Sequence, residues 1–191
     1  MVSSNIIIGL LWMAWLIYWL LSGLKAKKSK RQHNWWIDIG LRVVIFAVII
    51  IILRTPALYN FLVNSHSESF YSNPTINDLG IFIALLGLVF SIWARISLGK
   101  NWGMPGTVRE KPDLVTTGPY AYVRHPIYTG VIAAMLGTTL VTTIFWSIPF
   151  IVFSVYFIYN SKREEKDMLE QFPKEYKEYM KHTKFLIPFI Y

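Results

Sequence analysis

Long hydrophobic stretches separated by short polar segments are the main pattern along this chain. The apolar stretches lie at about 6–24, 37–53, 79–98 and 126–159, with 63 as an alternative end of the second. A run of about 20 apolar residues matches the thickness of a bilayer core, where a chain satisfies its own backbone polar groups by forming helices. The last stretch has room for two short spans, with a turn expected near 138–143. The pattern predicts an all-α integral membrane helical bundle with about five transmembrane helices in a single membrane domain, 1–191.

Composition agrees with this prediction and excludes several kinds of site. The chain is 54% hydrophobic and only 16% charged, with a mean hydropathy of +0.40. Its net charge is +8, and the basic residues lie beside the apolar stretches. This placement indicates contact with membrane lipids and no nucleic-acid binding. There is no cysteine, and the four histidines are scattered, so neither thiol chemistry nor a metal site is predicted.

The placement of lysine and arginine predicts the topology. Basic residues gather at 25–31, 100–124 and 162–184, whereas 55–78 contains none. The positive-inside rule therefore predicts an N-terminus outside and a C-terminus in the cytoplasm. The first stretch lacks a basic segment before it, so we expect a retained anchor and not a signal peptide. Arg95 falls near a span end, where we expect its side chain to extend to the interface.

The loop 99–125 is a candidate site because it is long and rich in glycine and proline. Pro126 suits the first turn of a helix, which places His125 at the N-cap. Free amides at that helix start, with Arg124 and His125 as further donors, favour a carboxylate or phosphate. Tyr128 lies one turn from Arg124 on the same side. The alternative is that the loop seals the bundle, Arg124 anchors a lipid headgroup and His125 is only a cap.

Acidic residues stand out at the end of the last apolar stretch. Glu164 and Glu165 come within one turn of the membrane, at the start of an expected cytoplasmic helix, 161–184. Such carboxylates would bind a cationic ligand group, although a surface charge cluster with Arg163 and Lys166 is an alternative. An anion site and an acidic pair at neighbouring helix ends would together suit a zwitterion, and aromatic faces nearby would favour its cationic part.

Three motifs resemble one known family. They are LGKNW at 98–102, LVTTGPYAYVRHPIYTG at 114–130, and REEKDMLEQFPKEYKEY at 163–179, followed by FLIPFIY. The last 95 residues or so resemble the isoprenylcysteine carboxyl methyltransferase family of integral-membrane enzymes, which includes phospholipid N-methyltransferase-like proteins. Two departures are Pro112, where members often have histidine, and Pro173, where many have glycine. The first puts one cofactor contact in doubt, and the second concerns local helix geometry.

The resemblance implies S-adenosyl-L-methionine as cofactor, a cytoplasmic active site, and a lipophilic or lipidated acceptor entering from the bilayer. It divides the chain into two N-terminal spans (1–75) and a family core (76–191) with a cofactor loop (99–125) and a helical hairpin (126–160). It assigns the catalytic roles to Arg124 and Glu165. The cofactor-binding residues that it implies are Leu98, Gly99, Trp102, Leu114, Val115, Gly118, Tyr120, Val123, Arg124, His125, Pro126, Tyr128, Glu164 and Glu165.

Two other functions compete with a methyltransferase. A membrane reductase using NADPH would resemble sterol reductases, but these tend to have asparagine where Ile127 stands. A non-catalytic transporter or lipid-binding protein would need polar relay residues, and no Asp, Glu or Lys lies mid-span. The small residues Gly130, Ala133, Ala134 and Gly137 predict helix packing and not a pore. The acceptor, whether a prenylcysteine carboxylate, a phospholipid amine or a small apolar thiol, stays open.

Overall fold

The computed structural model describes residues 3–23, 73–101, 113–142 and 146–187, and these residues form helices and no extended sheet. The predicted stretch at 37–53 lies outside the described residues, as do Trp102 and Pro112. Two described helices, α1 (Ser4–Gly23) and α5 (Pro74–Leu98), are long and apolar enough to cross a membrane. The all-α prediction is therefore confirmed for the described part of the chain.

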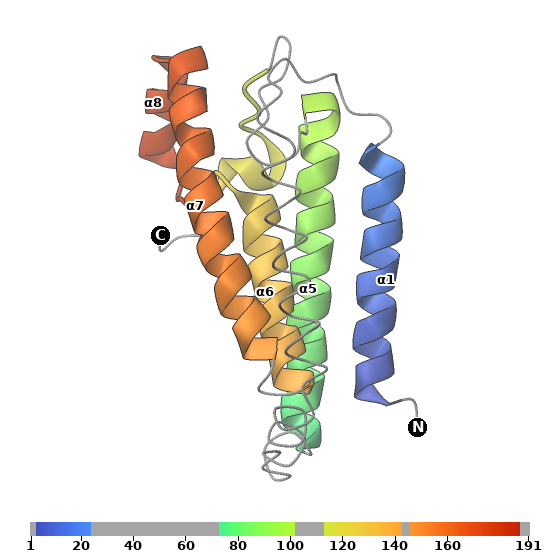
Figure 1. Cartoon of the computed structure of the whole chain (residues 1–191). Helices are drawn as coiled ribbons and strands as arrows, with labels where there is room; N and C mark the ends of the chain where they lie inside the picture. The colour runs from blue at the N-terminus through green and yellow to red at the C-terminus, as the bar shows by residue number, and fades with distance from the viewer. Residues whose placement is uncertain (1–2, 24–72, 102–112, 143–145, 188–191) are drawn as a thin grey trace, which may run out of the picture.

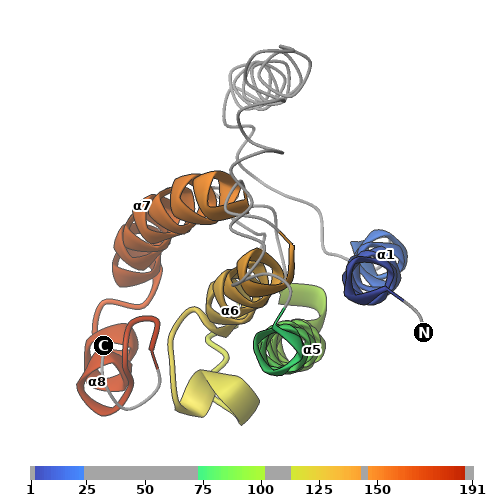
Figure 2. The ribbon, with the colours of Figure 1, turned by 90° about the horizontal axis from the view of Figure 1, so that it is seen from below.

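The remaining helices place both candidate stretches at one end of the bundle. Helix α6 (Pro126–Val141) runs opposite to α5, and α7 (Ser147–Gln171) then returns beside α6 (Figure 1). The short helix α8 (Glu175–His182) follows, and two 3₁₀ turns, η1 (Gly99–Asn101) and η2 (Gly118–Ala121), lie between α5 and α6. Viewed along the helices, α1, α5, α6 and α7 follow one another around an arc (Figure 2). The end of α7 thus meets the start of α6.

Small residues let α5 and α6 approach until their backbones touch. On α5, Gly80, Ala84 and Gly87 are buried, and on α6 the same holds for Gly130 and Ala134. A Cβ atom added at Gly87 would lie 2.5 Å from the Gly130 carbonyl oxygen and 2.6 Å from the Ala134 nitrogen. Close backbone contact of this kind is a principal source of helix association in a bilayer. Gly130 and Ala134 are therefore packing residues, as the sequence predicted.

Helix α1 is attached through a small apolar cluster and through polar contacts of its indoles. Only Ile8 is buried on it, in a small cluster with Ala84 of α5 and Val141 of α6. The Trp15 indole donates to the Ser91 hydroxyl on α5 at 2.7 Å, and the Trp12 indole donates to a threonine on α6 at 2.9 Å. Because most of the apolar surface of α1 faces outward, these directional bonds fix its position on the bundle.

Replacing Trp15 by phenylalanine tests the contribution of one such bond. The change keeps an aromatic ring and removes the donor, so we expect a loss of about 1 kcal/mol in the free energy of unfolding in detergent. The Ser91 hydroxyl donates to the Leu88 carbonyl, so it retains a partner. In a Ser91→Ala background the effect of Trp15→Phe should be smaller. An undiminished effect there would show that the indole stabilises α1 through something else.

The direction of the Arg95 side chain differs from the prediction. Its side chain does not extend outward; the residue is only 4% exposed. The guanidinium donates to the Gly99 carbonyl at 2.8 Å and to the Ser22 carbonyl at 2.7 Å. These oxygens lie where α5 and α1 end, and carbonyls at a helix end lack partners within the helix. Arg95 therefore joins the two helix ends, and the contacts offset the burial of its charge.

Two helix boundaries also differ from the prediction. Helix α6 continues through Thr138 to Val141, into the range where the turn was expected. The hydroxyls of Thr138, Thr139 and Thr142 donate to carbonyls four residues earlier, so these polar side chains are satisfied within the helix. The expected cytoplasmic helix 161–184 is interrupted between Gln171 and Glu175, around Pro173. A proline has no amide hydrogen and its ring clashes with the preceding turn, so α8 starts as a separate helix.

Candidate functional site

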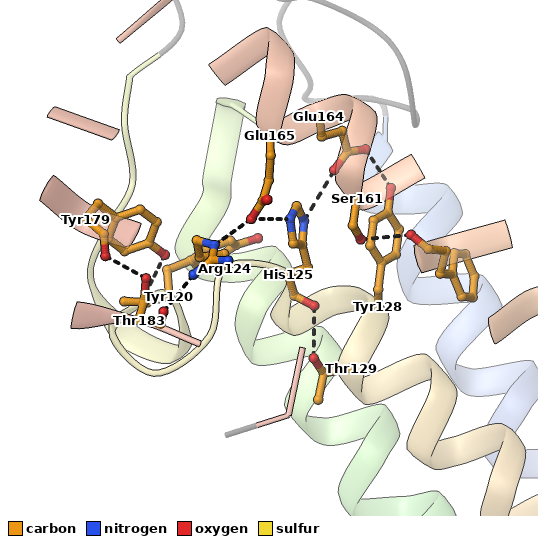
Figure 3. Close-up of polar contacts among 11 residues, drawn as sticks. Tyr120, Arg124, His125, Tyr128, Thr129, Ser161, Glu164, Glu165, Tyr179 and Thr183 are labelled. Atoms are coloured by element: carbon orange, nitrogen blue, oxygen red, sulfur yellow. Dashed lines mark hydrogen bonds and ion pairs between the residues drawn. The ribbon is translucent and has the colours of Figure 1, made fainter. Parts of the chain in front are cut away.

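The start of α6 has the local structure that its sequence predicts. Pro126 is the first helical residue, and His125 is the N-cap, with a φ of −124° and a ψ of 56°, which is neither helical nor fully extended. A proline at this position loses no hydrogen bond, because the first amides of a helix have no carbonyl partner within it. The His125 side chain makes no capping bond and is directed toward α7 (Figure 3). It is therefore available for contacts with that helix.

Arg124 and Glu165 form the central ion pair of the site. The Arg124 Nε atom lies 2.5 Å from Glu165 Oε1, and Arg124 Nη1 donates to the Thr183 carbonyl at 2.6 Å. The two side chains are 10% and 14% exposed, so water screens the pair only weakly. The residues are 41 positions apart in sequence. The prediction that residues 124–128 and 164–165 converge is therefore met by direct contact.

His125 lies between the two carboxylates (Figure 3). Its Nδ1 atom is 3.6 Å from Glu164 Oε2, and its Nε2 atom is 3.6 Å from Glu165 Oε1. The Tyr128 hydroxyl donates to Glu164 Oε1 at 2.6 Å. One connected series of polar groups thus runs from Arg124 through both glutamates and His125 to Tyr128. The hydrogen bonds from Arg124 and Tyr128 to the two glutamates hold these four side chains in position.

Aromatic rings enclose the polar groups. The Tyr128 ring stacks on Phe157 of α7 with ring centroids 4.8 Å apart. His125 is stacked with Tyr128 at 6.0 Å and meets the edge of Phe185 at 5.3 Å. Such surroundings exclude water and favour cationic ligand groups over the ring faces. The site is therefore polar at its centre and apolar at its rim.

The network changes the proton affinity of two of its members. Burial disfavours the imidazolium of His125, but its contacts with Glu164 and Glu165 outweigh burial and raise its pKa above 6.5. Burial likewise disfavours the charged form of Glu165, but its contacts with His125 and Arg124 outweigh burial and lower its pKa below 4.5. Both shifts favour the charged forms, so the network is most stable when His125 is protonated and Glu165 is ionised.

These shifts predict a pH optimum for stability. Because folding raises the pKa of His125, protonation of this residue stabilises the fold. This contribution is fully present below pH 6.5 and is lost as the pH rises through the pKa of the folded state. Because folding lowers the pKa of Glu165, ionisation of this residue stabilises the fold. This contribution is fully present above pH 4.5 and is lost as the pH falls through the pKa of the folded state. Thermal unfolding in detergent should therefore show highest stability between pH 4.5 and 6.5. His125→Gln should remove the alkaline decline, and an unchanged alkaline decline in that variant would contradict this origin.

Other residues predicted for the cofactor site lie around this network. Gly118 adopts a φ of +63°, and a Cβ atom there would lie 2.7 Å from the Ser97 hydroxyl, so glycine is required for both reasons. Tyr120 is buried, and its carbonyl accepts a hydrogen bond from the Tyr179 hydroxyl at 2.6 Å. Val123 is fully buried under the site. These contacts give all three residues structural roles; whether they touch a cofactor stays a prediction.

The remaining residues that were predicted to bind the cofactor lie farther from the network. Leu98 ends α5, and Gly99 caps it with a φ of +54°. Leu114 and Val115 are half-buried in the segment leading to η2. Their contact with a cofactor stays a prediction, and Trp102 lies outside the described residues.

Sequence reasoning missed the segment after α8. Thr183 supplies the second acceptor of Arg124, and the Leu186 carbonyl accepts a hydrogen bond from Thr129 at 2.5 Å. Both acceptors are backbone carbonyls, which every residue has, so no side-chain pattern marks them. The FLIPFIY stretch, which starts at Phe185, was part of the family resemblance, but the resemblance assigned it no role in the site.

Comparison with known proteins agrees with this geometry. The family model described as phospholipid methyltransferase matches residues 76–175, just over half of the chain. The chain belongs to the phospholipid methyltransferase family. The match includes α5, α6 and α7 and every member of the Arg124–Glu165 network.

Among proteins similar to this family member are two protein-S-isoprenylcysteine O-methyltransferases. That of Schizosaccharomyces pombe is 31% identical over 153 residues, covering 76% of this chain and 59% of the relative. That of Tribolium castaneum is 28% identical over 119 residues, covering 60% and 42%. The chain thus spans about half the length of the curated relatives it matches.

A solved structure shares the fold of this family member. It is the eukaryotic intramembrane Ras methyltransferase, isoprenylcysteine carboxyl methyltransferase, with a TM-score of 0.50 and 24% sequence identity. The match covers 72% of this chain and 54% of that chain. The likeness supports an intramembrane helical fold for the chain.

Proposed function

We propose that this protein is an integral-membrane methyltransferase that uses S-adenosyl-L-methionine and acts on a lipophilic acceptor. The observation that carries the proposal is the convergence of Arg124 and His125 with Glu164 and Glu165 at one end of a bundle of this family. Basic and acidic groups side by side suit a zwitterionic ligand, because each charged end finds an opposite charge.

The residues present fit this cofactor chemically. Among the described residues, His125 Nε2 is a buried nitrogen without a hydrogen-bond partner, since Glu165 lies just too far away. Glu164 keeps 31% of its side chain exposed, so it has room for a ligand. The start of α6 adds amides at Ile127 and Tyr128 that have no carbonyl partner within the helix. Donors for a carboxylate and an acceptor for an ammonium or hydroxyl group are thus adjacent.

With a carboxylate acceptor, the residues of the site would bind and orient the ligands, with no proton transfer required of them. When bound, the cofactor supplies a methyl group already activated on a sulfonium. His125 and the α6 amides would bind its carboxylate, while Glu164 would bind its ammonium or ribose. Arg124 would hold Glu165 in place and steady the carboxylate of an acceptor. The aromatic rim, with Tyr128 and Phe157, would exclude water, which favours a reaction that removes charge.

Calorimetry with S-adenosylhomocysteine tests the proposal. Detergent-purified protein should bind it, whereas NADPH should not compete. Absence of binding by the wild-type protein, or binding of NADPH in its place, would overturn the proposal. The acceptor is then identified by measuring methyl transfer from a radiolabelled donor to each of two substrates. Transfer to a farnesylated cysteine would indicate a carboxylate acceptor, as the names of the relatives suggest, and transfer to a phospholipid amine would indicate the chemistry in the family's description.

We also propose a topology of five spans with the site on the cytoplasmic side, supported by the basic segments at 25–31, 100–124 and 162–184. Helices α1 and α7 run in the same direction, so the N-terminus and α8, which follows α7, lie at opposite ends of the bundle (Figure 1). Ser3 directly precedes α1, and Lys181 is on α8. Because the chain has no cysteine, single-cysteine variants report position without background.

Labelling with a membrane-impermeant maleimide tests this topology. The Ser3→Cys variant should react in intact cells, and the Lys181→Cys variant should react only after permeabilisation. Lys181 is well exposed, with 67% of its side chain accessible, so a lack of reaction in intact cells would not come from burial. Labelling of both variants from the same side would exclude five spans.

A further inference from the structure

The chain after α8 returns to the start of α6 and pairs with it. The Lys184 amide donates to the Tyr122 carbonyl at 3.1 Å, and the Arg124 amide donates to the Lys184 carbonyl at 2.8 Å. Together these bonds form a parallel bridge between Val123 and Lys184. The backbone of Arg124 is thereby held from the far end of the described chain.

The same segment also binds side chains of the site. The Thr183 carbonyl accepts the Arg124 guanidinium at 2.6 Å. The Leu186 carbonyl accepts the hydroxyl of Thr129, one turn into α6, at 2.5 Å. The segment from Thr183 to Leu186 therefore contacts the arginine on one side and the first turn of α6 on the other.

Phe185 is the side chain at the centre of this segment. It is 7% exposed and lies against both basic members of the network. Its ring is at 75° to the His125 ring with centroids 5.3 Å apart, and the Arg124 Cζ atom is 5.7 Å from its centroid. These are the separations of an edge-to-face aromatic pair and of a cation–π contact. One ring thus limits the movement of both the guanidinium and the imidazole.

We propose that Thr183 to Leu186 form a positioning element of the cofactor site, in which the Phe185 ring orients Arg124 and His125 toward the two glutamates. The proposal rests on the proposed function for its ligand, but the placement of His125 is measurable without one. Phe185 is a positioning residue, because its effect on a ligand passes through the two basic side chains.

Two variants distinguish the effect of the aromatic ring of Phe185 from the effect of its volume. Phe185→Met keeps apolar volume without a ring, and Phe185→Tyr keeps the ring. The exposed neighbour Ile187, changed to alanine, serves as the control. Dissociation constants for S-adenosylhomocysteine come from calorimetry, and the His125 ring-proton shifts come from NMR of histidine-labelled protein, assigned with His125→Gln. Unfolding temperatures of all variants report on overall stability.

We expect Phe185→Met to weaken binding about tenfold, corresponding to roughly 1.4 kcal/mol, and to shift the His125 ring signals. Ile187→Ala should bind as the wild type does, and Phe185→Tyr, which keeps the ring, should lose less affinity than Phe185→Met. Equal loss in the methionine and tyrosine variants, or wild-type binding by Phe185→Met, would overturn the proposal. If the wild type binds no S-adenosylhomocysteine, the proposed function fails; His125 signals unchanged in Phe185→Met would separately overturn the positioning role.

Discussion

Glu165→Gln is expected to weaken S-adenosylhomocysteine binding by at least about 100-fold, because it leaves the buried Arg124 charge without its counter-ion. The amide keeps the shape of the side chain and can still accept one hydrogen bond, so the loss would come from charge. His125 would also lose one of its two carboxylate contacts. Arg124→Ala should give a similar loss, because Glu165 would then be the uncompensated charge.

Glu178→Gln is the matched control for this experiment. Glu178 also accepts from a cation, Lys181, at 2.6 Å, but both side chains are at least 60% exposed. Exposed pairs of this kind contribute little to stability, so binding should be unchanged. Calorimetry on the three variants checks the result. Wild-type affinity in Glu165→Gln would show that the ion pair is not part of the binding site.

Gly87→Ala is expected to destabilise the protein by about 3 kcal/mol or more, the upper range for overpacking, although it adds a single methyl group. The new atom would lie 2.5 Å from the Gly130 carbonyl oxygen and 2.6 Å from the Ala134 nitrogen. Both are backbone atoms, so α5 and α6 would have to move apart. This separation would also displace the start of α6, and with it the cofactor site.

Gly9→Ala is the control, because it makes the same change on a helix where no atom lies within 4 Å of the added Cβ. Alanine favours helix over glycine by about 1 kcal/mol, so this variant should be as stable as the wild type or more so. Thermal unfolding in detergent, with binding of S-adenosylhomocysteine, measures both effects. Equal stability of the two variants would show that α5 and α6 are less closely packed than described.

Features that depend on a few neighbouring residues could be predicted from the sequence. The helix start at His125 and Pro126 is one, because a proline restricts both its own backbone and that of the residue before it. The packing role of Gly130 and Ala134 is another, since small residues at helical spacing in an apolar segment have few other uses. The convergence of the two polar stretches followed from their common end of the bundle.

Pairing within the site could not be predicted in the same way. The sequence suggested an anion site at Arg124 and a separate cation site at the glutamates, whereas Arg124 and Glu165 bind each other. Which of the two adjacent glutamates faces Arg124 depends on the rotation of α7 about its axis. A short sequence motif does not determine that rotation. The segment after α8 was missed because its contacts use backbone carbonyls.

The contacts of α1 have a consequence for biogenesis. The indole of Trp12 finds its acceptor at Thr138, which is 126 residues later in the chain. While the chain is being made, α1 therefore exists before this partner does, and its length and hydropathy are those of a helix that could cross a bilayer by itself. Docking becomes possible only after α5 and α6 have been inserted, so α1 is made before both partners and reaches its place beside them only once they are present.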